Sequence, residues 1–270
     1  MTLSRGLRAT LLVITTVALV VVYAPLALVV LNSFNTDRSF AWPPPGLTLR
    51  WWSAAAGSEG ARAALLVSVQ VALLATLAAL LLGTMAALAL QRSRFFGRSG
   101  ISLLIILPIA LPGIVTGIAL NNAFRTIFGL ELGFLTIVVA HATFCIVTVF
   151  NNVQARLRRL GGNLEEASMD LGAGTFTTFR LVTLPLLRSA LLAGGLLAFA
   201  LSFDEIIVTT FTAGAREQTL PLWIFNNLFR PNQAPVVNVV AAVLIVASII
   251  PIWLAQRLSG SRNEGLTGAR

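Results

Sequence analysis

The polar residues that could do chemistry gather in two short stretches of an otherwise apolar chain. One stretch holds Ser202, Asp204 and Glu205, near the end of an apolar run. Ionisable side chains in such a run are costly and usually face a cavity or a partner, so these residues are candidate ligands for a cation moving through a pore. The alternative is that they lie at the end of the run, where water already hydrates them.

The second stretch, residues 163–185, separates two apolar runs. Asn163 followed by Glu166 has the form of a helix-capping box, in which the Asn side chain accepts from an early N–H and the Glu side chain reaches back to the cap. A short helix is therefore expected to begin at Asn163. The stretch also holds three of the ten acidic residues, Glu165, Glu166 and Asp170.

Two glycines follow this predicted helix. Glycine ends helices readily because it adopts positive φ, so Gly172 and Gly174 are expected to end it. A second short helix is predicted over 175–184, with Pro185 in the first turn of the next apolar run. Two short helices placed between apolar runs indicate a docking surface.

His141 and Cys145 are the lone histidine and the lone cysteine. A single cysteine rules out an internal disulfide. The two residues are four positions apart and would share one helix face, but a metal site needs more ligands than this pair supplies. We therefore expect both side chains to pack between helices and expect no metal site.

The composition predicts an all-α integral membrane protein. The chain is 57% hydrophobic and 11% charged, with a mean hydropathy of +0.87, far outside the range of soluble domains. Its net charge of +9 comes from arginine alone, because the sequence has no lysine. A nucleotide-binding P-loop requires lysine, so this chain has none. A basic chain can also bind nucleic acid, but the arginines are distributed as in a membrane protein.

A helix needs about 20 apolar residues to cross a bilayer, and six runs meet that length. They are residues 7–31, 63–90, 101–123, 132–153, 186–208 and 236–254. The first run follows two arginines as a signal peptide would, but it lacks a clear cleavage site and is long enough to span. We therefore expect a single domain over residues 1–270 with six transmembrane helices.

The arginines predict the orientation of these helices. If successive loops alternate between the two sides, one side carries twice as many arginines as the other. By the positive-inside rule that side is cytoplasmic, together with both termini and residues 163–185. The arginines assigned to it are Arg5, Arg8, Arg92, Arg94, Arg98, Arg156, Arg158, Arg159, Arg180, Arg257, Arg262 and Arg270.

Two further features concern the path through the membrane. Pro108, Pro112 and Gly113 would interrupt the third predicted span, and such breaks either mark a translocation path or are ordinary kinks. The proline-rich loop that contains Trp42 is expected to be stiff, with its tryptophans at the outer membrane interface. Contact of this loop with a ligand or an external partner is the alternative.

The second polar stretch resembles the EAA motif of ABC importer permeases. Glu166–Ser168, Gly172 and Val182–Pro185 match the spacing E-A-A-x3-G-x9-I-x-L-P, with Ser in place of the second Ala and Val in place of Ile. The likeness extends along nearly the whole chain, to the segments Asn32–Asn35, Ala140–Val149 and Ala200–Gly214. Within the family, the chain is similar to the second permease subunit of spermidine/putrescine importers.

This resemblance implies a type I importer fold, with a cytoplasmic coupling helix in residues 163–185, between the fourth and fifth transmembrane helices. It implies three kinds of partner: a sister permease, an ATPase dimer that holds ATP and Mg²⁺, and an external solute-binding protein. This chain would then be no enzyme, would hold no cofactor, and would lie in the bacterial inner membrane. The residues assigned to ATPase coupling are Glu166, Ala167, Ser168, Gly172, Leu184 and Pro185.

The resemblance also implies a polyamine ligand. Ser202, Asp204 and Glu205 match the acidic fifth-span position that is associated with the substrate path, and Trp42 is a fourth candidate. Carboxylates and aromatic faces suit ammonium groups. Gly113 departs from the pattern, which often has an acidic residue there, and the sister subunit could supply that charge. Related permeases for ferric iron, aminoethylphosphonate or thiamine are the alternative.

Two other classes of function fit the sequence less well. An ATPase-independent channel or secondary transporter would need more charges inside the membrane, or paired broken helices in two related halves, and neither is evident. The other is a membrane scaffold that only recruits a partner, and the acidic pair and the interrupted third span are weak arguments against it.

Overall fold

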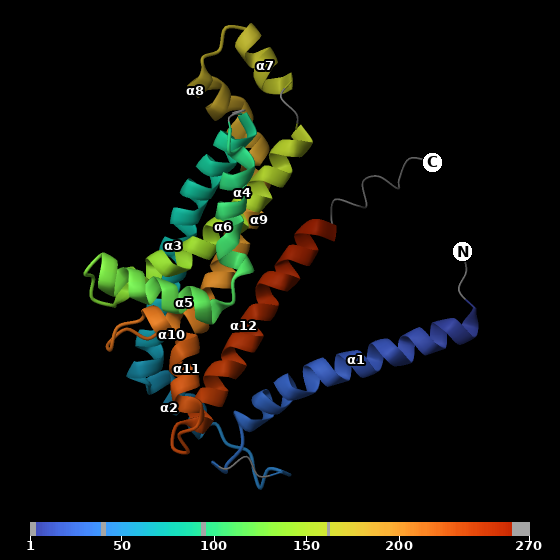
Figure 1. Cartoon of the computed structure of the whole chain (residues 1–270). Helices are drawn as coiled ribbons and strands as arrows, with labels where there is room; N and C mark the ends of the chain where they lie inside the picture. Colours follow the sequence, from blue (N-terminus) through green and yellow to red (C-terminus); the bar gives the residue numbers. More distant parts are fainter. Residues whose placement is uncertain (1–3, 39–41, 93–95, 161–162, 261–270) are drawn as a thin grey trace. The chain divides into compact units, whose positions relative to one another are not determined.

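The computed structural model describes residues 4–38, 42–92, 96–160 and 163–260, with side chains as far as residue 247 (Figure 1). Within these residues the chain is helical, and its one extended pairing is an isolated bridge between Asn35 and Leu47. The helices form two compact units, one of Met1–Arg62 with Ile224–Arg270 and the other of Ala63–Trp223.

The first unit holds α1 (Arg5–Asn32), α2 (Arg50–Gly57) and α12 (Ala234–Gly260). α12 contacts both α1 and α2. α1 buries none of its residues and is apolar on all sides, which is typical of a helix that faces lipid.

In the second unit the central helix is α6 (Phe134–Leu160), which contributes most to the buried core. α3 (Glu59–Arg92) and α9 (Leu184–Phe203) flank it, as Figure 1 shows. The backbones approach closely at glycines: a Cβ on Gly83 would lie 2.9 Å from the Ile146 carbonyl oxygen. The other elements are α4 (Arg98–Ala110), α5 (Gly113–Asn122), η1 (Ala123–Ile127), α7 (Asn163–Asp170), α8 (Thr175–Thr178), η2 (Phe179–Thr183) and α10 (Ile207–Thr212), and α11 (Leu220–Leu228) begins here.

Four helices of the described residues are long and apolar enough to cross a bilayer: α1, α3, α6 and the continuous helix Thr175–Phe203. They overlap the predicted runs 7–31, 63–90, 132–153 and 186–208. The predicted run 236–254 falls in α12, where Ala234–Ala247 forms a shorter apolar stretch. Arg94, Arg262 and Arg270 and the side chain of Arg257, on which the predicted orientation partly depends, lie outside the described residues.

The third predicted span, residues 101–123, is interrupted as expected. α4 ends at Ala110, and the helix from Gly113 to Ile127 is bent by 106° from it. Pro112 has no N–H to donate, and it holds Leu111 in extended backbone with ψ of 144°. If this bent pair is taken as one span, the described residues hold five candidate membrane spans by length and composition.

The fifth predicted span differs from the structure at both ends. α8, η2 and α9 form one continuous helix, so the second short helix predicted over 175–184 does not end before the span. The chain accommodates Pro185 because the preceding residues form the wider π-helical turn η2. At the other end the helix stops at Phe203, and the prediction of helix as far as Val208 is wrong, because polar side chains there bond to the backbone of a turn.

Candidate functional sites

The predicted short helix is present as α7, and Gly172 ends it as expected. Gly172 has a φ of +84°. Its N–H donates to the Met169 carbonyl at 2.9 Å, and the N–H of Ala173 donates to the Ser168 carbonyl at 3.1 Å. These two bonds form a Schellman cap, which needs a left-handed residue at its centre, so the backbone itself requires glycine at this position.

Two details of the predicted motif are wrong. Asn163 is already helical, and within the described residues neither its side chain nor that of Glu166 makes a hydrogen bond, so the capping box is not formed. A cap must precede the first turn, and Asn163 lies inside it. Gly174 has a φ of −70°, which any residue adopts, so it does not share the role of Gly172.

Glu165, rather than Glu166, carries the charged contact of α7. Its Oε1 lies 2.5 Å from Arg92 Nη2, at the end of α3, and accepts from the Thr183 hydroxyl of η2 at 2.5 Å. Arg92 Nη2 also donates to Thr183 Oγ1 at 3.2 Å. We call this set the Arg92–Glu165–Thr183 junction. Sequence reasoning missed it, because Arg92 and Glu165 are 73 residues apart and no local pattern links them.

The remaining motif residues on α7 point outward or toward α8. Glu166 and Ala167 are exposed. Ser168 is half-buried, and its hydroxyl shares a hydrogen bond of 3.0 Å with the buried Thr178 of α8. Within the described residues, side chains hold α7 through one ion pair and two hydroxyl contacts, and the carboxylate of Glu166 is exposed.

Large apolar side chains are exposed around α7. Leu171 and Phe176 are 89% and 75% exposed. Leu184 and Pro185, in the first turn of α9, are exposed too. Exposed apolar side chains of this size are covered either by lipid or by a partner protein, and the docking surface predicted for this stretch stays a prediction.

The second predicted site lies at the turn between α9 and α10. His141 of α6 is fully buried and bonds to both sides of this turn: Nδ1 lies 2.8 Å from Ser202 Oγ, and Nε2 lies 2.8 Å from Thr209 Oγ1. The Thr209 hydroxyl donates to the Glu205 carbonyl at 3.0 Å. It therefore accepts from His141 Nε2–H, and Nδ1 accepts from Ser202.

The three predicted ligands at this turn play different parts. Ser202 is buried against His141, and Glu205 Oε1 accepts from the Val208 N–H at 2.8 Å, which caps α10. Asp204 is exposed and makes no side-chain hydrogen bond or ion pair within the part of the chain described. Of the three, Asp204 alone has a side chain without a hydrogen bond or ion pair among the described residues.

The second half of the broken span is attached to the helix that follows this turn. A Cβ on Gly113 would lie 3.3 Å from Ile207 Cγ2, and one on Gly117 would lie 2.7 Å from Phe211 Cδ2. Asn121 Nδ2 donates to the Phe211 carbonyl at 2.5 Å. The spacing by four residues puts Gly113, Gly117 and Asn121 on one face of α5, so small residues and an amide join α5 to α10.

His141 and Cys145 pack between helices, as expected. The Cys145 thiol donates to the Ala198 carbonyl of α9 at 3.3 Å and is fully buried. No group of three or more metal-ligating side chains occurs among the described residues. Both residues thus serve the packing of α6 against α9.

Trp42 belongs to the other unit and is 69% exposed. Among the side chains that the structure describes in that unit, Trp51 is the buried tryptophan, and its indole N–H donates to the Asn35 carbonyl at 2.8 Å. The guanidinium carbons of Arg38 and Arg50 lie 5.5 and 4.2 Å from the Trp51 ring centroid. The ring of Trp42 is therefore open to a membrane interface or a partner, while Trp51 is structural.

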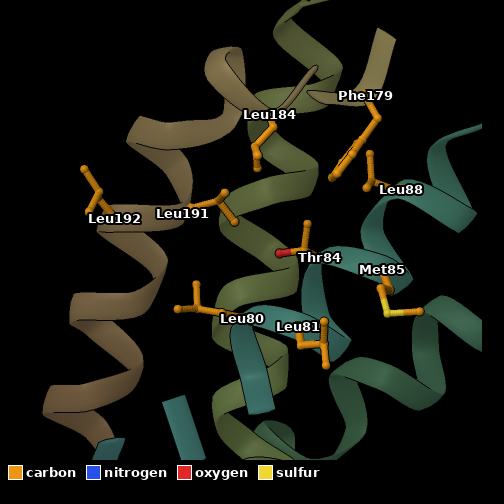
Figure 2. Close-up of a pocket in the computed structure, with 9 residues that line it drawn as sticks. All are labelled: Leu80, Leu81, Thr84, Met85, Leu88, Phe179, Leu184, Leu191 and Leu192. Carbon is orange, nitrogen blue, oxygen red and sulfur yellow. The ribbon is translucent and has the colours of Figure 1, made fainter. Parts of the chain in front are cut away.

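An apolar groove of about 310 Å³ lies between α3 and the continuous helix of η2 and α9 (Figure 2). Leu80 and Leu88 line it from α3, and Phe179, Leu184 and Leu191 line it from the other side. Figure 2 shows Leu88, Phe179 and Leu184 at one end of the groove and Leu80 toward the other.

Comparison with known proteins places the chain among transport components. The model of the family "Binding-protein-dependent transport system inner membrane component" matches residues 79–262. The chain is 33% identical over 246 residues to the spermidine/putrescine transport system permease protein PotC of Escherichia coli (strain K12), covering 91% of this chain and 92% of that protein. It is 33% identical over 259 residues to the putrescine transport system permease protein PotI of the same strain, covering 92% and 91%.

Two solved structures share the fold. A bacterial ABC transporter involved in the import of the acidic polysaccharide alginate matches with a TM-score of 0.70 and 17% identity, over 97% of this chain and 99% of that chain. An amino acid ABC transporter with histidines matches with a TM-score of 0.59 and 18% identity, over 80% and 100%. At these identities the likeness shows the fold alone.

Proposed function

The chain belongs to the family of binding-protein-dependent transport system inner membrane components, the permease subunits of ABC importers, and we propose that it forms half of the translocation path for a polyamine. The observation that carries the ligand proposal is Asp204, an exposed carboxylate without a side-chain partner in the described residues, on a turn that His141 holds from both sides. A polyamine is a flexible polycation, and a carboxylate in a fixed position binds ammonium by a charge-assisted hydrogen bond.

The architecture we propose has six transmembrane helices, with the bent α4–α5 pair as the third and α12 as the sixth. α7 would lie between the fourth and fifth, on the cytoplasmic side, as would both termini. The arginine distribution supports this orientation. The exposed ring of Trp42 would then lie on the outer side, at the interface or beside the entering ligand.

The partners we propose are a sister permease, an ATPase dimer that supplies ATP and Mg²⁺ chemistry, and an external solute-binding protein. The exposed Glu166, Ala167, Leu171 and Phe176 support α7 and its flanking turn as the surface that meets the ATPase. ATPase closure would displace α7, and the continuous helix Thr175–Phe203 would carry that displacement toward the Asp204 turn. The cavity would then open alternately to each side.

Gly113 favours the alternative ligands, ferric iron, aminoethylphosphonate or thiamine, within the same importer class. A Cβ here would lie 3.3 Å from Ile207 Cγ2, so an acidic side chain at this position would require the Ile207 side chain to shift slightly. The negative charge that related permeases often place after the third-span proline would have to come from the sister subunit. Family membership leaves no reason to propose an ATPase-independent channel or secondary transporter.

The test is ATPase activity of the importer reconstituted from this chain, its sister permease, its ATPase and its binding protein. The ligand panel is spermidine, putrescine, ferric iron, thiamine and aminoethylphosphonate. We expect a polyamine to stimulate hydrolysis, and we expect Asp204→Asn to raise the half-maximal polyamine concentration about tenfold, because one charged contact is lost. Glu205→Gln keeps the acceptor that caps α10 and should have a smaller effect.

Glu131→Gln is the matched control, since Glu131 is an exposed carboxylate in a loop outside the proposed path. Stimulation by another ligand alone would keep the importer and overturn the polyamine. Failure of an ATPase to co-purify with the permease pair would overturn the proposed assembly.

A further inference from the structure

The Arg92–Glu165–Thr183 junction connects three elements that the EAA motif alone does not connect. α7 is joined to η2 and α9 along the chain, so a displacement of α7 reaches them through the backbone. α3 lacks such a connection, because its last residue, Arg92, precedes Glu165 by 73 residues. The junction supplies this connection, because the carboxylate of α7 accepts hydrogen bonds from both the guanidinium of α3 and the hydroxyl of η2.

The junction links α3 to the continuous helix of η2 and α9 beyond one end of the apolar groove. α3 and α9 meet at Leu80, whose Cδ1 would lie 3.4 Å from a Cβ on Gly195. Beyond that contact the apolar groove separates them. Arg92 lies twelve residues further along α3, or about 18 Å. The two helices are thus in contact at one end of the groove and linked by polar bonds beyond the other end, where Leu88 and Leu184 lie (Figure 2).

The junction contributes little to folding stability, but its bonds fix the position of α7 relative to α3. Thr183 is buried, but the Arg92 and Glu165 side chains are 37% and 22% exposed. Water screens such a pair, so its contribution to folding stability is small. Its bonds are nevertheless short and directional, so they hold α7 in one position relative to α3.

We propose that Arg92, Glu165 and Thr183 are positioning residues that make α3 move together with α7, so that both walls of the groove respond when the partner ATPase displaces α7. The proposal deepens the proposed function and rests on it, since it takes α7 as the ATPase contact. It assigns Glu165 a part distinct from that of its neighbour Glu166: Glu165 binds inward to α3 and η2, and Glu166 stays exposed for the partner.

The first test places one fluorescent probe on each wall of the groove, in the reconstituted importer. Met85→Cys reports on α3 and Leu192→Cys reports on α9; both positions are exposed and line the groove, whereas the native Cys145 is buried. We expect ATP to change the signal of both probes. In Glu165→Gln the α9 probe should still respond, and the α3 probe should lose most of its response.

A purely structural effect of Glu165→Gln would weaken both probes together, and that result overturns the proposal, as does an unchanged α3 response. Glu166→Gln is the comparison on the same helix: loss of an ATPase contact should weaken both probes equally. If neither probe responds to ATP in the unsubstituted importer while ligand-stimulated hydrolysis persists, the junction transmits nothing. Absence of ligand-stimulated hydrolysis would instead overturn the proposed function itself.

The second test exchanges the charges. Arg92→Glu and Glu165→Arg each place like charges side by side, and each should lower ligand-stimulated hydrolysis about tenfold. The double variant Arg92→Glu with Glu165→Arg restores an opposite-charge pair and should recover most of that loss. If the double variant is no better than the worse single variant, the two residues act separately and the proposal is wrong.

Discussion

Around α7, Leu171 and Phe176 are 89% and 75% exposed, whereas at the turn after α9, His141 and Thr209 are fully buried. We call the first region the α7 segment (residues 163–178). Among the described residues, its side chains bond to the rest of the chain through the Arg92–Glu165–Thr183 junction, while the Ser168–Thr178 contact is internal to it. The second, the Asp204 turn (residues 202–209), draws its bonds from α6, α9 and α10.

The difference is what the roles we propose for the two regions require. A surface that binds another protein must leave its apolar residues uncovered until that protein arrives. A turn that presents one carboxylate to a small ligand must be held in place beforehand by its own chain. Substitutions at the Asp204 turn should therefore destabilise the isolated chain, and substitutions on the α7 segment should be visible mainly in the assembled importer.

The strongest test of this contrast is His141→Ala. It removes two hydrogen bonds, leaves the hydroxyls of Ser202 and Thr209 buried without their partner and opens a cavity, so we expect a loss of about 3 kcal/mol in folding stability. Thermal unfolding of the detergent-solubilised chain measures it. Thr143→Val is the control, because the Thr143 hydroxyl bonds only locally, to the Ala140 carbonyl. Equal unfolding temperatures for the two variants would contradict the role given to His141.

The next effect concerns the contact between α5 and α10. Gly117→Val would place a Cβ 2.7 Å from Phe211 Cδ2. Overpacking of this kind should cost about 2 kcal/mol and displace α10 from α5, which should also lower transport. Gly100→Val is the matched control, since nothing lies within 4 Å of a Cβ at that position. Thermal unfolding and uptake in proteoliposomes would be compared, and a similar loss in both variants would contradict the tight contact.

On the α7 segment, Gly172→Val tests the Schellman cap. The positive φ of Gly172 is strained for valine, so we expect a loss of about 1 kcal/mol although a Cβ would meet open space. Gly174→Val also meets open space but has a φ of −70°, and it should cost less. Coupled transport should stop in Gly172→Val while the spans still insert, as protease accessibility would report. Normal coupling in that variant would show that the cap does not carry the signal.

The smallest effect on stability is expected for Leu171→Ala. An exposed residue contributes within about 0.5 kcal/mol to folding, so the unfolding temperature should not change. The affinity for the ATPase, measured by co-purification at graded salt and protein concentrations, should fall about tenfold if Leu171 is buried in that interface. Phe128→Ala, at an exposed residue outside the α7 segment, should change neither quantity. A fall in stability with unchanged ATPase affinity would contradict the proposed difference between the α7 segment and the Asp204 turn.

Several features were predictable from sequence because they depend on local backbone physics. The lack of an N–H on Pro112 interrupts the third span, and the freedom of Gly172 to adopt positive φ ends α7. Long apolar runs predicted the long apolar helices in the same way. The capping box failed because Asn163 and Glu166 have the right types and spacing, yet the helix begins one position too early for Asn163 to serve as its cap.

Local sequence was thus enough to identify the apolar runs, the positions that break a helix, and the two places where carboxylates are adjacent. It could not tell which carboxylate of each pair bonds within the chain: Glu165 binds Arg92 and Glu205 caps α10, while Glu166 and Asp204 stay exposed. Adjacent residues on a helix or turn point in different directions, and the element that lies in each direction comes from a distant part of the chain, so this choice depends on the folded arrangement.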